Sequence, residues 1–90
     1  TLPVSFRLEQ NYPNPFNPST TLRFTLSQAS HIRLEVFDLL GRHTSTITEG
    51  LYTAGSHEFN WSCPSCASGL YILQLTDGSA TRQRKMLFLK

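Results

Sequence analysis

Apolar and polar side chains alternate along almost the whole chain, and this period of two limits the folds that the chain can adopt. Every second residue of 22–26 is apolar, and the same pattern returns at 32–36. Such alternation is typical of strands that bury one face and expose the other. The two apolar rows agree in parity across the short link 28–30, so we expect a tight connection and one sheet that buries both rows.

The rest of the chain predicts more strands of the same kind. The strands expected there are 42–47, 56–61, 71–76 and 81–90. Asp77-Gly78 is a strong hairpin signal, and it joins the last two of these strands. Residues 49–55 and 63–69 are rich in turn-forming residues and are the expected loops.

The fold class follows from the shortness of these segments. Parallel strands would need crossover helices, for which the chain has no room. We therefore expect an all-β, antiparallel immunoglobulin-like β-sandwich of about seven short strands. Residues 1–10 are predicted to form a linker and the first strand, and 11–90 a single sandwich domain. Thr1-Leu2-Pro3 is typical of a linker, which suggests a fragment from the end of a longer chain, and no apolar run is long enough to predict a membrane span.

A proline-rich segment, 11–18, interrupts the alternation. Prolines cannot donate to a ladder and push the preceding residue towards extended geometry, so this segment is not a central strand. Tyr12 and Phe16 are expected to anchor it to the sandwich as an extended loop, although a proline-rich ligand for an aromatic groove is the alternative. The structural motif expected here comprises Asn11, Pro13, Pro15, Phe16, Asn17 and Pro18.

A tight turn is expected at 38–42. Asp38 can accept hydrogen bonds from its own downstream backbone, and Gly41 can take a positive φ without a steric penalty. Gly41 and Arg42 are therefore counted as structural motif residues as well. If that φ is positive, a β-branched residue at Gly41 should cost more than an ordinary surface substitution.

The charge is weak overall but uneven. A formal net charge of +2 is less than nucleic-acid-binding proteins usually carry, so no nucleic-acid partner is expected. Half of the 8 Lys and Arg residues lie within 82–90, with no acid among them. Charge alone leaves two interpretations of this basic end: an edge strand protected by charge, or a tag that a partner reads.

The search for catalytic chemistry finds one motif, Cys63-Pro64-Ser65-Cys66. No helix is predicted after Cys63 to stabilise a thiolate, and a zinc site would need two more ligands at a spacing that the histidines lack. We predict no enzyme, no metal and no cofactor. The two cysteines are either a local disulfide or free thiols.

Five blocks of the sequence resemble one family. They are Leu8–Pro18, Val36–Arg42, Ala54–His57 with Trp61, Ala67–Tyr71 and Lys85–Lys90. In this order they are similar to the type A C-terminal sorting domains of the bacterial type IX secretion system. The related immunoglobulin-like domain of flagellar hook-capping proteins shares the middle blocks but not this combination of opening and ending.

The resemblance implies an exported protein of a Bacteroidota-type bacterium that reaches the medium or the cell surface through the periplasm. Its expected partners are the outer-membrane translocon, a sortase-like peptidase and an upstream cargo domain of the same chain. The family's recognition elements correspond to Gly69, Tyr71, Lys85 and Lys90. Cys63 and Cys66 depart from the small polar residues that the family's loop tends to carry.

Two other functions compete with this one. An adhesive or carbohydrate-binding immunoglobulin-like module of a secreted enzyme would need a surface row of aromatics, for which Phe37, Tyr52 and Phe88 are the candidates. A passive structural spacer would need no site at all.

Overall fold

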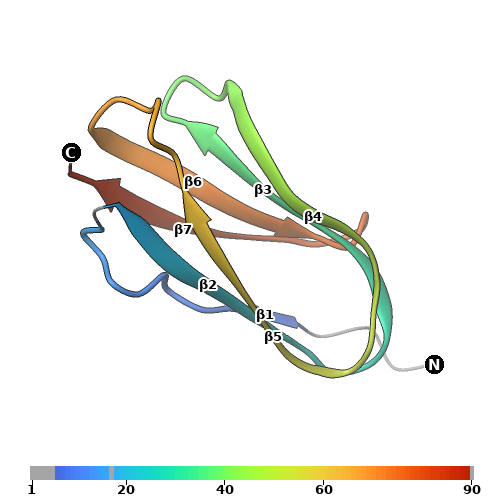
Figure 1. Cartoon of the computed structure of the whole chain (residues 1–90). Helices are drawn as coiled ribbons and strands as arrows, with labels where there is room; N and C mark the ends of the chain where they lie inside the picture. Colours follow the sequence, from blue (N-terminus) through green and yellow to red (C-terminus); the bar gives the residue numbers. More distant parts are fainter. Residues whose placement is uncertain (1–5, 17, 90) are drawn as a thin grey trace.

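The computed structural model describes residues 6–16 and 18–89, and the regular structure there is β-strand throughout (Figure 1). The strands are β1 (Phe6–Leu8), β2 (Ser19–Leu26), β3 (Ser30–Asp38), β4 (His43–Tyr52), β5 (Gly55–Ser62), β6 (Gly69–Thr76) and β7 (Thr81–Phe88). None of the described residues belongs to a helix long and apolar enough to cross a membrane. The expectations for Asn17 and Lys90 lie outside the described residues.

The strands form two antiparallel sheets that face each other. The three-stranded sheet has the order β1-β2-β5, and the four-stranded sheet has the order β4-β3-β6-β7. Figure 1 shows the two sheets as separate layers, with the C-terminus at the end of β7. The predicted all-β, antiparallel sandwich is confirmed.

One expectation about the sheets is wrong: β2 and β3 do not share a sheet. β2 pairs with β1 and β5, while β3 pairs with β4 and β6, so residues 27–29 carry the chain across from one layer to the other. Both apolar rows are nevertheless buried, as the alternation predicted. A strand alternates in the same way whether its apolar row lies on one face of a single sheet or on the inner face of one of two facing sheets. The parity of two apolar rows therefore does not show whether their strands share a sheet.

The expected loop at 49–55 is also wrong, since β4 continues to Tyr52 and β5 begins at Gly55. The reason is the pairing with β3, which runs without interruption from Leu34 opposite Thr48 to the end of β4. The glycine and polar residues there form a ladder with β3 and leave only two residues for the turn. Pairing across the sheet overrides the local turn preference.

The core lies between the inner faces of the two sheets. Its fully buried side chains come from both layers and include Leu22, Phe24, Ile32, Leu34, Val36, Leu73, Leu75 and Met86. At the end of the sandwich near the C-terminus, Phe16 extends this core, with its ring 5.7 Å from Trp61 and 5.0 Å from Phe88. Each such side chain stabilises the fold by about 2 kcal/mol through burial.

The turn between β3 and β4 is built as the sequence predicted. The Asp38 carboxylate accepts hydrogen bonds from the backbone amides of Leu40 and Arg42, both at 2.9 Å, and from Nε of Arg42 at 2.8 Å. Gly41 has a φ of 83°, a conformation that disfavours any residue with a Cβ. The turn thereby holds Leu39 and Leu40 in solvent.

Candidate functional site

The C-terminal hairpin β6–β7 is the candidate site. β6 lies inside the four-stranded sheet, between β3 and β7, whereas β7 forms one edge of that sheet (Figure 1). The two strands pair along their full length, from Thr76 opposite Thr81 to Gly69 opposite Phe88. The hairpin signal at Asp77 thus predicted both the turn and the return strand correctly.

A carboxylate organises the turn of this hairpin. Oδ1 of Asp77 accepts hydrogen bonds from the backbone amides of Ala80, at 2.8 Å, and Ser79, at 2.9 Å, and from the Ser79 hydroxyl at 3.0 Å. Gly78 follows with a φ of 95°. The amide of Ala80 first, and then that of Ser79, lower the pKa of the Asp77 carboxyl below its ordinary value of 3.8.

We expect the stability of the domain to fall in acid partly through this carboxylate. Because the folded pKa of Asp77 is lowered, the stabilisation is complete above 3.8 and is lost as the pH falls through the folded pKa. The effect is small, since water screens an exposed group. Urea unfolding at neutral and strongly acidic pH should show a smaller loss of stability for Asp77→Asn than for the original chain. The same pH dependence in both proteins would contradict this role.

The predicted recognition residues occupy different environments. Tyr71 is 8% exposed and faces the core, where its hydroxyl donates to the carbonyl of Ala67 at 2.7 Å. Gly69 is half-buried at the first position of β6, and a Cβ built there would have no atom within 4 Å. Lys85 is exposed on β7, and Lys90 lies outside the described residues. Of the three described residues, only Lys85 is exposed.

The proline-rich segment lies along the end of β7. The amide of Phe16 donates to the carbonyl of Leu87 at 3.0 Å, and the carbonyl of Phe16 accepts from the amide of Leu89 at 3.1 Å. Oδ1 of Asn14 accepts from the amide of Leu87 at 2.9 Å. An edge strand exposes such groups, so this segment covers the last part of the edge of β7.

Asn11 holds the proline-rich segment in shape. It is 2% exposed, and its Nδ2 donates to the carbonyl of Pro13 and to Oγ1 of Thr20, both at 3.0 Å. Its Oδ1 accepts from Nε2 of Gln10 at 2.7 Å, and the same Nε2 lies 2.7 Å from the carbonyl of Lys85. The buried side-chain amide of Asn11 thus fixes the path of the loop, and Gln10 links the loop to β7.

The two expected anchors of this segment differ. Phe16 is 1% exposed and is buried as predicted, but Tyr12 is 80% exposed, so its expected anchoring role is wrong. The backbone of Tyr12 pairs with Thr21 instead, and this bridge turns the ring into solvent. The described prolines of the motif, Pro13, Pro15 and Pro18, are exposed.

Cys63 and Cys66 are joined by a disulfide in the loop between β5 and β6. Both side chains pack partly buried against the core cluster. The amide of Cys66 also donates to the carbonyl of Cys63 at 3.1 Å, so the bridge closes a single turn.

The aromatics proposed for a glycan-binding surface do not form a surface row. Phe88 is 2% exposed and stacks on Phe16 inside the core, which rules it out as a surface contact. Phe37 and Tyr52 are half-buried. The ring of Tyr52 packs 5.7 Å from that of Phe24.

Comparison with known proteins identifies what this arrangement resembles. Residues 10–89 match the model of a family described as "Secretion system C-terminal sorting domain". The crystal structure of dimeric latent PorU from Porphyromonas gingivalis contains a similar fold, with a TM-score of 0.75 and 17% sequence identity. That similarity covers 99% of this chain and 10% of the PorU chain. No curated protein sequence matches the chain.

Proposed function

The chain belongs to the family of secretion system C-terminal sorting domains, which are the sorting signals of type IX secretion, and we propose that its β6–β7 hairpin is the part that the export machinery reads. Membership implies that the protein is exported to the cell surface or the medium. We propose that the cargo is a preceding domain of the same chain. We also propose that the protein passes through the periplasm on its way out. The sorting domain itself has no catalytic role in this proposal.

One observation supports the proposal that the sorting signal is part of a folded domain. The family match spans both the proline-rich segment and the hairpin, and the backbone of Phe16 bonds to Leu87 and Leu89 at the end of β7. The end of the chain is therefore held in the sandwich up to Leu89. A partner that reads this end meets a fixed strand with a defined sequence of side chains.

The exposed side chains of the hairpin suit recognition by a partner. Lys85 and Leu70 point away from the core, and Ile72 lies opposite Lys85 in the register. Such a surface offers a charge for orientation and apolar area for affinity. We assign its recognition to the outer-membrane translocon, and the later removal of the domain to a sortase-like peptidase.

Fusing residues 1–90 to a reporter that carries a signal peptide tests this function. In a host with a type IX translocon, the reporter should reach the medium or the cell surface. In the same host without the translocon, it should stay in the periplasm. Retention of the folded fusion in the periplasm of the competent host would contradict the proposal.

A further inference from the structure

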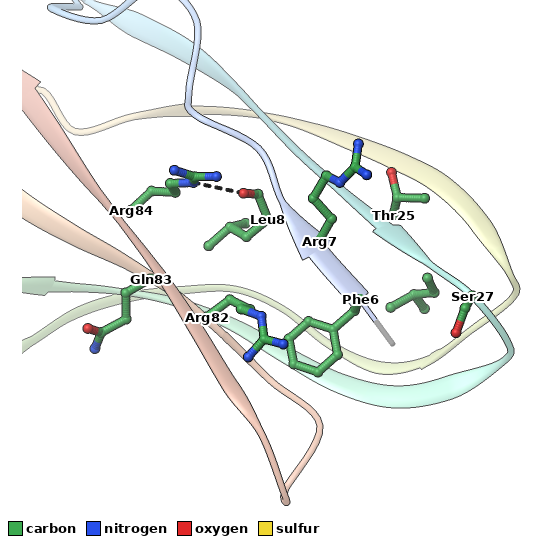
Figure 2. Close-up of a pocket in the computed structure, with 9 residues that line it drawn as sticks. Phe6, Arg7, Leu8, Thr25, Ser27, Arg82, Gln83 and Arg84 are labelled. Carbon is green, nitrogen blue, oxygen red and sulfur yellow. Dashed lines mark hydrogen bonds between the residues drawn. The ribbon is translucent and has the colours of Figure 1, made fainter. Parts of the chain in front are cut away.

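The edges of the two sheets meet at a groove that the sorting function does not explain. β1 is an edge of the three-stranded sheet, β7 is an edge of the four-stranded sheet, and a groove of about 440 Å³ lies between them (Figure 2). Phe6, Leu8 and Leu26 provide apolar lining on one side. Arg82 and Arg84 line it on the side of β7. The lining of the groove is thus mixed: it combines these apolar side chains with polar ones, and it includes Arg7 as well as the two arginines of β7.

Each of these two arginines is held in place by β1. Nε of Arg84 donates to the carbonyl of Leu8 at 2.9 Å, and the guanidinium of Arg82 lies over the ring of Phe6, 5.2 Å from its centroid (Figure 2). Nη1 of Arg82 also donates to the carbonyl of Thr81 at 3.3 Å. These contacts still leave several guanidinium N–H groups of the two arginines for another acceptor.

The charge of the groove is not balanced by acids. None of the 6 acidic residues of the chain, all of which are described, lines it. The nearest ion pair joins Arg7 and Glu9 at 3.9 Å, and Figure 2 shows Arg7 directed towards Thr25, away from the two arginines of β7. Arg82 and Arg84 have no carboxylate partner among residues 6–16 and 18–89. An anionic group is therefore the complementary ligand.

Beside these arginines, the backbone edge of β7 is open. Both backbone groups of Leu87 point outwards, to Asn14 and Phe16, so by the alternation of an antiparallel strand those of Lys85 and Gln83 point outwards too. The carbonyl of Lys85 already accepts a hydrogen bond from Nε2 of Gln10. Within the described part of the chain, the amide of Lys85 and both backbone groups of Gln83 have no partner.

We propose that this groove binds an extended acidic polypeptide segment, which adds as a further strand to β7 at Gln83–Lys85 and directs two alternate carboxylates at Arg82 and Arg84. Side chains of adjacent strands lie on the same face at matching positions, so acids spaced by one residue face both arginines. The open amides and carbonyl supply the backbone bonds of strand addition. This inference does not rest on the sorting function.

The test uses the purified chain, labelled for NMR, and a short capped peptide in which Glu alternates with Thr. The amides of Gln83 and Lys85 should shift on titration, and binding should weaken as ionic strength rises. A peptide with Gln in place of Glu should bind about tenfold more weakly or worse, because it lacks the charge. Equal binding of the two peptides, or no shift at Gln83 and Lys85, would overturn the proposal.

Variants separate the two parts of the site. The double variant Arg82→Gln/Arg84→Gln should lose at least about tenfold in affinity for the Glu peptide. Arg23→Gln, a control at an exposed position of β2, should bind as the original chain does. Gln83→Pro keeps both arginines but removes an outward amide, which an edge strand tolerates, and it should abolish peptide binding.

Other occupants would give different results. Inorganic phosphate that shifts the same amides as strongly as the peptide would show a simple anion site and overturn strand addition. Shifts that depend on protein concentration without peptide would assign this edge to a second copy of the chain, which also overturns the proposal. If the arginine variant does not fold, the salt dependence of binding and the Gln83→Pro variant still test whether the peptide binds through its charge and through strand addition.

Discussion

The Phe16→Ala variant is expected to lose about 3–5 kcal/mol of its free energy of unfolding, which is the usual cost of truncating a buried Phe. Phe16 is 1% exposed and packs between Trp61 and Phe88, so its removal leaves a cavity where the proline-rich segment meets the core. Domains of this size are stable by about 5–15 kcal/mol, so the loss is a large share of the total. Urea unfolding followed by Trp61 fluorescence measures it.

Tyr12→Ala is the matched control for this prediction. It removes an aromatic ring from the same segment, but from a side chain that is 80% exposed. We expect a change within about 0.5 kcal/mol, as for surface substitutions in general. Equal losses in the two variants would show that Phe16 is not the anchor of the segment.

Deleting residues 81–90 is expected to abolish export of a fused cargo. The deletion removes the whole of β7, with its buried Met86 and Phe88, and leaves the backbone edge of β6 unpaired. It therefore removes the proposed signal and breaks the sandwich that displays it. Cell fractionation should find the reporter in the periplasm, and the reporter's own activity shows that the cargo has folded. Export of the truncated fusion at the original level would contradict this prediction.

The sequence predicted most of the strands because alternation reports directly on burial. At 22–26 and 32–36 every apolar residue of the pattern is buried. Alternation says nothing about which sheet a strand joins, so it does not reveal that β2 and β3 belong to different sheets. The prediction of a loop at 49–55 is wrong for a related reason. Glu49 and Gly50 are ordered by pairing with β3, and this pairing depends on the tertiary structure rather than on the local sequence.

The candidate site was predictable in part. The turn at Asp77 and the two strands of the hairpin follow from local signals. The proline-rich segment that covers the end of β7 and the groove beside β7 cannot be predicted from local signals, since both depend on residues far apart in the sequence. Gln10 reaches Lys85 and Arg84 reaches Leu8 across separations of 75 and 76 positions. Composition alone also could not tell exposed Tyr12 from buried Phe16, because both are aromatics beside prolines.

The fraction of a signal-peptide-bearing reporter found outside the outer membrane tests the central claim most directly. We predict that the fusion to residues 1–90 is exported by a type IX-competent host and that the fusion lacking 81–90 is retained. The Tyr12→Ala fusion should be exported like the intact one, since its sandwich is unchanged. An intact fusion that folds in that host and yet stays in the periplasm would contradict the claim that this domain is an export signal.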